Sequence, residues 1–345
     1  MRFATPFLLW LLLLAPARII LQTSYFERGG SPLITLAALD GLTPARQANE
    51  TRPVLTYVLI AFAPIAVTAK LVEKRTPRVY EAVLLVAIVA PLVATVYAMW
   101  RLWEEWIGWR ELTLFVVLYL LTGIGTTVGY HRLVAHESFR TRPSVKAVLL
   151  ALGAMNVQGQ VINWAAYHRR HHAHSDREGD PHSPREGLLH AHVGWLFRAS
   201  PAERERYCKR LLADPVVVLI DRTAVVWTLA GLLIPYIVAG STGLLWGGLV
   251  RIAFTNHVTF AVNSICHMYG SRPFATKDAS RNNLLIGLLG FGEGWHNNHH
   301  AFPRAAFHGI GWRQPDVSGL IIRGLERVGL AWDVRRAPAT AVDVR

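Results

Sequence analysis

The stretch His168-Arg169-Arg170-His171-His172 is the feature around which the rest of the chain is organised. On a helix, positions i, i+3 and i+4 project from one face about one turn apart, so its three imidazoles would lie together. Three protonated rings would repel one another, and the cluster therefore indicates neutral rings that share a metal ion. The stretch predicts a helix with metal ligands on one face.

Two further groups of histidines repeat this pattern. The same spacing recurs at 296–300 as His-Asn-Asn-His-His, and a looser pair, His131 and His136, lies upstream. With His267 the groups hold nine imidazoles, more than the roughly six ligands that one first-row metal ion accepts. They indicate two metal ions, or one ion and several spectator histidines. Neutral imidazole suits iron, zinc and copper alike, so the ligand type leaves the metal open.

The composition points to a membrane protein. Of the 345 residues, 52% are hydrophobic and only 17% are charged, and the mean hydropathy is +0.27. A net charge of +13 is also found in nucleic-acid-binding proteins. In a chain this apolar, arginines that face an anionic membrane leaflet explain the charge better, and we expect no nucleic-acid partner. Two cysteines exclude a disulfide framework.

Several apolar runs are long enough, or nearly so, to cross a membrane. We predict an uncleaved membrane helix at 7–21 and further spans at about 54–72, 80–100, 112–130, 223–240 and 243–265. Lys74, Arg75 and Arg78 crowd one junction, whereas basic and acidic residues balance in 101–111, so the positive-inside rule places 74–79 in the cytosol. Tryptophans at 100, 103, 106 and 109 then form an aromatic belt on the outer side.

This topology brings every histidine group to one side of the membrane. Both termini and the polar segments 131–222 and 266–345 are expected in the cytosol, where they form a cap. Residues 145–164 contain several amides and are predicted to be an interfacial or re-entrant helix that leads into His168. Residues 316–334 are predicted to be an amphipathic surface helix. The fold class predicted is all-α: a polytopic membrane helical protein whose cytosolic helical cap carries a histidine-rich di-metal site.

The histidine segments also resemble a known family. The segments 131–136 (HRLVAH), 168–172 (HRRHH), 263–267 (NSICH) and 292–300 (GEGWHNNHH) are similar to the histidine boxes of membrane fatty-acid desaturases, most of all the acyl-CoA (stearoyl-CoA type) Δ9 desaturases. The shorter segments 180–182, 192–195 and 329–333 resemble further family sequence. The resemblance spans about 80–335, so we interpret 80–345 as a desaturase domain and 1–79 as N-terminal membrane segments outside it.

The resemblance implies a di-iron centre held by nine histidines. The implied ligands are His131, His136, His168, His171, His172, His267, His296, His299 and His300, and Asn263 would approach one iron through water. Trp164 and Thr259 match family residues that bend the acyl chain beside the irons, and Gln158 matches a residue that helps to hold the bend. Glu137, Asp176, Asp180 and Glu293 lie beside the boxes, and we expect some of them to accept hydrogen bonds from the imidazoles.

The implied reaction introduces a cis double bond, at Δ9, into a saturated long-chain acyl group. Such C–H bonds are too weakly acidic for any side chain to remove the proton, so the metals, dioxygen and two electrons must carry the chemistry. We expect a separate electron-donor protein, a long-chain acyl-CoA or acyl-lipid substrate, and a multi-pass protein of the cell membrane whose active site faces the cytosol. Arg198-Ala199-Ser200 replaces the basic pair of the animal enzymes, which weakens the case for acyl-CoA.

Other interpretations remain open at the level of sequence. An acyl-lipid desaturase or a lipid hydroxylase would use the same iron ligands. A metal transporter would need acidic or histidine residues along its spans, and the spans hold almost none. The arginines between 198 and 210 form either a solvated basic face or a phosphate-binding surface. His174, His182, His190 and His192 are expected to lie around the metal site or at the surface, and His257 and His308 to be structural.

Overall fold

The computed structural model describes residues 77–104, 107–198, 202–338 and 340, all of which belong to one compact unit, Tyr57–Arg345. The spans predicted at 7–21 and 54–72 lie outside these residues. The described part is helical apart from one antiparallel pair of short strands, β1 (Arg140–Thr141) and β2 (Ala331–Trp332). The predicted helical fold class is therefore confirmed.

Three segments of the described chain are long and apolar enough to cross a membrane. The first, Ala82–Trp100, lies within helix α4 (Pro77–Glu104). The second, Trp109–Ala135, joins α5 (Trp109–Ile124) to the π-helix η2 (Gly125–Ala135) and is longer than the predicted run 112–130. The third, Ala224–His267, consists of α12 (Ala224–Gly243), η5 (Leu244–Val250), α13 (Arg251–Ser264) and η6 (Ile265–His267).

The third segment is a hairpin of two legs. Its 44 residues would extend about 66 Å if straight, roughly twice the thickness of a bilayer core. The backbone leaves the helical conformation at Ala239 and at Gly240, whose φ of +59° suits a residue without a side chain. Beyond the break the legs pack closely, because a Cβ at Gly247 would lie 2.8 Å from that of Pro235. The break lies at the end of the predicted span 223–240, just before the predicted span 243–265.

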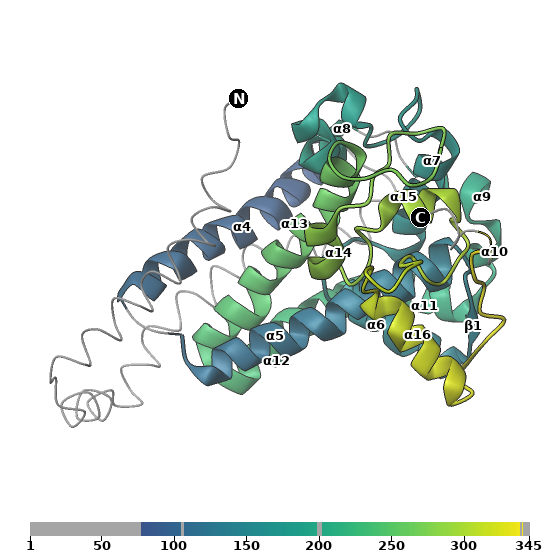
Figure 1. Ribbon diagram of the computed structural model, residues 1–345. Helices are drawn as coiled ribbons and strands as arrows, with labels where there is room; N and C mark the ends of the chain where they lie inside the picture. Colours follow the sequence, from purple (N-terminus) through teal and green to yellow (C-terminus); the bar gives the residue numbers. More distant parts are fainter. Residues whose placement is uncertain (1–76, 105–106, 199–201, 339, 341–345) are drawn as a thin grey trace, which may run out of the picture. The chain divides into compact units, whose positions relative to one another are not determined.

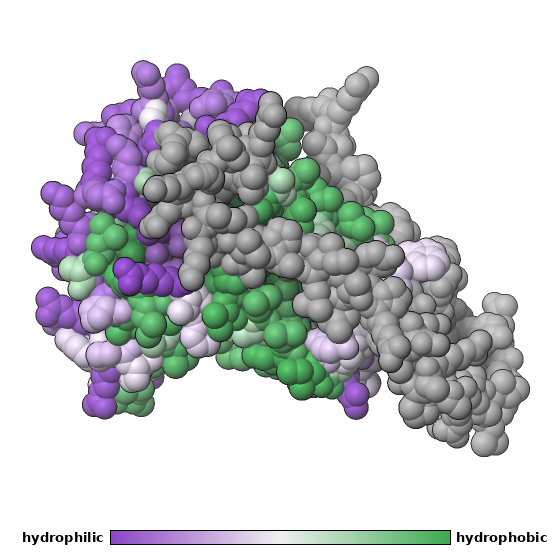
Figure 2. All heavy atoms as spheres, turned by 180° about the vertical axis from the view of Figure 1, so that it is seen from behind, coloured by the Kyte–Doolittle hydropathy of each residue, from purple (hydrophilic) through white to green (hydrophobic). Residues whose placement is uncertain are grey.

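The apolar helices lie alongside one another and expose apolar side chains. α4, α5, α12 and α13 run side by side in Figure 1, and α5 contacts both α12 and α13. Hydrophobic residues gather over these helices and hydrophilic residues gather at one end (Figure 2). Of the four tryptophans predicted to form a belt, Trp100 and Trp109 are exposed, and the other two side chains lie outside the described part. This surface fits a chain embedded in lipid.

The cap is built from shorter helices. Its elements are α6 (Pro143–Ala154), α7 (Val161–His174), η3 (Pro184–Glu186), η4 (His190–Gly194), α8 (Trp195–Arg198), α9 (Arg204–Tyr207), α10 (Lys209–Leu212), α11 (Pro215–Arg222), α14 (Leu284–Leu289), α15 (His296–Ala301) and α16 (Val317–Arg327). The single helix predicted over 145–164 is wrong: a turn separates α6 from α7, and Val157 and Gly159 in it have positive φ. The amphipathic helix predicted over 316–334 is also shorter, because the chain after α16 forms β2.

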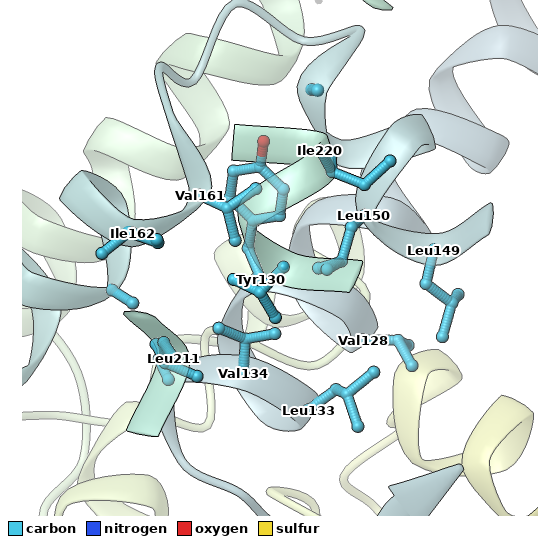
Figure 3. Close-up of a cluster of buried hydrophobic side chains, with 14 of the residues drawn as sticks. Val128, Tyr130, Leu133, Val134, Leu149, Leu150, Val161, Ile162, Leu211 and Ile220 are labelled. Carbon is cyan, nitrogen blue, oxygen red and sulfur yellow. The ribbon is translucent and has the colours of Figure 1, made fainter. Parts of the chain in front are cut away.

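A buried apolar cluster fixes the helices that carry the first histidines. Tyr130 of η2 is inaccessible to solvent and packs among side chains of η2, α6, α7 and α11 (Figure 3). η2 approaches α6 so closely that a Cβ at Gly125 would lie 2.2 Å from the backbone nitrogen of Gly153. Because a π-helix rotates side chains relative to an α-helix of the same length, η2 sets the direction of His131 within this packed core.

Candidate metal centre

The histidines of the predicted site converge in two groups. The first group contains His131, His136, His168, His172 and His299, and the second contains His171, His267, His296 and His300. Within each group the nitrogen atoms all lie within 4.8 Å of one another. The structure thus brings together all nine histidines that the family resemblance implied, from η2 and its C-terminal cap, α7, η6 and α15.

In the first group the Nε2 atoms face one another. The Nε2 of His168 lies 2.9 Å from that of His131 and 2.7 Å from that of His136. The Nε2 atoms of His299 and His172 are 2.9 Å apart. Nitrogen lone pairs that face one another at these distances are arranged to bind a shared cation.

The second group has the same construction. The Nε2 of His296 lies 3.1 Å from that of His267 and 3.1 Å from that of His300. His171 approaches His300 at 3.4 Å. No carboxylate oxygen of the described residues belongs to either group of nitrogens.

Helix α7 contributes to both groups. His168 and His172, four residues apart, join the first group, whereas His171 joins the second. The interpretation that His168, His171 and His172 share a single ion is therefore wrong. At 3.6 residues per turn, position i+3 is rotated away from the line through i and i+4, so one helix can divide its ligands between two neighbouring ions.

The lowered pKa values of the buried histidines fit a site that binds metal. Burial, followed by the neighbouring imidazoles, holds the pKa values of His168, His172, His296, His299 and His300 well below the usual histidine value. The rings are consequently neutral, which is the form that ligates a metal. A nitrogen-only donor set of this kind suits a divalent first-row ion such as iron.

Carboxylates contact the Nδ1 atoms of three of these rings. The Nδ1 atoms of His171 and His267 lie 2.9 Å from oxygens of Asp180 and Asp176, respectively. His131 Nδ1 lies 2.5 Å from Glu293. A hydrogen bond from Nδ1 to a carboxylate fixes the tautomer and turns Nε2 toward the metal. Three of the four acceptors expected from the sequence therefore make such contacts.

The expectation that some of these carboxylates serve as acceptors is therefore met, but one acceptor was missed. Among the described residues the carboxylate of Glu137 binds Arg169 and Arg210 rather than an imidazole. His300 Nδ1 lies 2.8 Å from Asp278, a residue 22 positions away in a loop without histidines. Burial works against ionisation, yet the hydrogen bond and charge of His300 lower the pKa of Asp278 below its usual value. No signal in the histidine segments pointed to Asp278.

A buried ion network supports the first group from the C-terminal side. Arg132 is inaccessible to solvent and binds both Glu293, at 3.0 Å, and Asp316, at 2.9 Å. Asp316 also accepts a hydrogen bond from the backbone of Gly319 in the first turn of α16. Arg132 thus connects α16 to the carboxylate that orients His131.

Of the histidines outside the two groups, some pack against the candidate ligands and others lie away from them. His182 packs on His171 with 4.2 Å between ring centroids, and His308 packs on His299 at 4.4 Å. His192 and His257 lie outside both groups and contact each other, at 3.0 Å between nitrogens. His308 therefore lies against the candidate ligands rather than remote from them, whereas His257 packs away from them.

A mostly apolar cavity opens beside the two groups. His131, His168, His171 and His296 line it at one side, and its lining also includes Tyr119, Phe291, Trp164, Thr259 and Asn263. Gln158 connects two of these walls, because it accepts from Trp164 Nε1 at 3.2 Å and lies 3.4 Å from Thr259 Oγ1. It also donates to Asn256, which sequence reasoning missed. An apolar chain threaded through this cavity would lie against the imidazoles.

Comparison with known proteins gives a consistent result. The fatty acid desaturase family model matches residues 111–311. A hex-5-enoyl-[acyl-carrier protein] acetylenase of Moorena producens is 40% identical over 74% of this chain and 87% of that protein. An sn-1 stearoyl-lipid 9-desaturase of Anabaena variabilis is 38% identical, covering 66% and 85%. Delta-9 acyl-lipid desaturase 1 of Arabidopsis thaliana is 38% identical, covering 66% and 76%.

Proposed function

Because this chain belongs to the membrane fatty acid desaturase family, we propose that it introduces a cis double bond into a saturated long-chain acyl group carried by a membrane lipid. The enzyme class expected from the sequence, a fatty acid desaturase oxidoreductase, is confirmed. The observation that carries the proposal is the pair of buried histidine groups beside an apolar cavity. That arrangement supports a redox metal site held against a channel for an unactivated hydrocarbon.

We assign the nine histidines of the two groups as ligands of two iron ions, with Asn263 approaching one ion through water. The bound ions would supply the redox chemistry by which dioxygen, two electrons and two protons remove two hydrogen atoms from the acyl chain and leave two water molecules. The residues themselves hold the geometry: the carboxylates fix the ring orientations, and the apolar cavity excludes water from the carbon pair. Asn263 lines the same cavity as His296, which supports its assigned role.

The bend of the acyl chain is assigned to Trp164, Thr259 and Gln158. The indole of Trp164 stacks on His168 with 5.1 Å between ring centroids, so a chain lying against this indole would be close to the first group. Gln158 is hydrogen-bonded to both other residues and so ties the three side chains together. Positioning one carbon pair within a rigid wall is the means by which such a site selects among identical methylenes.

The acyl carrier and the position of the double bond are the finer parts of this proposal. Two of the relatives reported above are named for acyl-lipid substrates and for position 9, and a third for an acyl-carrier protein. The particular likeness to acyl-CoA enzymes expected from the sequence thus holds only at the level of the family. We propose a Δ9 acyl-lipid desaturase of the cell membrane, with its site on the cytosolic side and its electrons supplied by a separate protein.

Expression in cells that lack a desaturase of their own tests this function. Isotope-labelled saturated fatty acid is supplied, and the labelled lipid, acyl-CoA and acyl-carrier-protein pools are separated before their double bonds are located by mass spectrometry. We expect a mass loss of two hydrogens and the earliest labelled product in intact lipid. Earlier product on CoA or on the carrier protein would contradict the lipid carrier, and a gain of oxygen would indicate a hydroxylase. No new unsaturation, with iron and a reductant present, would contradict the proposed function.

A further inference from the structure

Arg251 is a charged residue in an unexpected place. It lies in the segment Ala224–His267, which is apolar enough to span a membrane, and its side chain is inaccessible to solvent. In the described part of the chain, each hydrogen bond that Arg251 donates ends on an uncharged oxygen. An arginine buried in this way is costly and is retained where it has a specific task.

The guanidinium satisfies carbonyls that the surrounding helices leave without partners. Its Nη2 donates to Gly231 O at 3.0 Å, and Gly231 lies four residues before Pro235, which has no N–H to offer. Its Nη1 donates to Met155 O at 3.1 Å, at the C-terminal cap of α6. The carbonyl end of a helix carries a partial negative charge, so this contact also offsets the charge of Arg251.

Arg251 holds the side chain of Asn156 most closely. Nη1 donates to Asn156 Oδ1 at 2.6 Å. The amide nitrogen of Asn156 donates in turn to Thr122 O at 2.8 Å and to Thr126 Oγ1 at 3.0 Å. One buried pair of residues therefore ties the end of α6 to α5, η2, α12 and α13.

Arg251 and Asn156 each contact a residue that lines the cavity. Thr126 and Thr255 both line the cavity; Thr126 is bonded to Asn156, and the hydroxyl of Thr255 donates to Arg251 O at 2.8 Å. Asn156 also begins the turn that carries Gln158. That turn contains Val157 with φ +58° and is therefore strained, so it needs contacts outside itself to keep its shape.

We infer that Arg251, acting through Asn156, is a positioning residue that fixes the turn bearing Gln158 and thereby determines which methylene pair lies at the histidine groups. This inference rests on the proposed function, because it assigns a further determinant of the same reaction. A shift of the turn along the acyl chain would present a neighbouring carbon pair to the histidine groups. Loss of the contact between Arg251 and Asn156 therefore changes the position of the double bond in addition to the amount of product.

The test is the distribution of double-bond positions made by Arg251→Lys and Asn156→Ala in cells without their own desaturase. Thr228→Val is the matched control, because Thr228 is buried and bonds the same end of α6, at Ala154 O, without contacting Asn156. Positional purity is a ratio, so it is independent of how much protein accumulates. We expect the fraction of an adjacent positional isomer to rise about tenfold in both variants, equivalent to about 1.4 kcal/mol in relative barrier heights, and to stay unchanged in Thr228→Val.

Several results would overturn the inference. One is a single unchanged isomer from both variants, and another is the same mixture of isomers from Thr228→Val. A third is loss of both variants from the membrane while Thr228→Val accumulates, because Arg251 would then have a purely structural role. Absence of unsaturated product from the unsubstituted chain would instead contradict the proposed function, so the two failures are distinguishable.

Discussion

At the level of single residues, sequence reasoning found the histidines that converge and missed much of what orients them. Repeated spacing made six of these histidines recognisable, His131 and His136 were a looser pair, and His267 was added at the end of a predicted span. The carboxylates beside the histidines in sequence could be guessed. Asp278 could not, because only folding brings it to His300. Arg132 was missed for the same reason, since its partners Glu293 and Asp316 are distant in the chain.

The first prediction at this scale concerns Asp278→Asn. Asparagine can still accept the hydrogen bond from His300 Nδ1, but without the charge that strengthens the imidazole as a ligand. We expect iron affinity to fall about 10–100-fold, the usual effect of losing such a support, measured as iron retained against increasing chelator. Asp333→Asn, at an exposed ion pair with Arg140, is the control. Equal retention by the two variants would contradict a role for Asp278.

The second concerns pH and the metal-free chain. The pKa values of His172, His296 and His299 are held well below the usual value, first by burial and then by their neighbours. The unfolded chain therefore binds more protons than the folded chain once the pH drops below about 6.5. We expect the melting temperature to be highest above that pH and to fall steadily toward pH 5 in detergent. A melting temperature that rose over this range would contradict buried neutral rings.

At the level of elements, apolar runs predicted where helices occur, and local backbone geometry decided where they break. The break between α6 and α7 was missed because the Asn156–Gln160 turn is stabilised by contacts from α5, η2 and α13, which no local pattern records. The π-helical backbone of η2 was equally invisible, since its residues differ little from those of an ordinary helix.

The close approach of η2 to α6 gives a prediction for Gly125→Ala. A methyl group there would meet backbone atoms of Leu152 and Gly153 at 2.2–2.5 Å, so the helices must separate. We expect a loss of about 1–3 kcal/mol in stability and reduced activity, because η2 carries His131. Gly324→Ala in α16 is the matched control: nothing lies within 4 Å of its added carbon. Equal melting temperatures for the two variants would argue against tight packing at Gly125.

At the level of the whole molecule, the sequence predicted that the histidine segments converge, but not how the nine histidines divide into two groups. The predicted topology put every histidine group on one side of the membrane, which allowed the groups to meet. The arrangement into five and four nitrogens depends on the rotation of α7 and α15, each of which sends histidines to both groups. Rotation of this kind is set by packing against the core, which a run of residues does not reveal.

The central claim is that the two groups hold two metal ions, and metal content tests it most directly. Full-length chain is purified anaerobically in detergent, and its metals are measured by mass spectrometry alongside His171→Ala and His172→Ala, which each remove one ligand from a different group. We expect about two iron ions per chain, because nine imidazoles exceed the roughly six ligands that one first-row ion accepts. We expect a lower iron content in each variant. An unsubstituted chain with one ion or none, or with zinc in place of iron, would contradict the account.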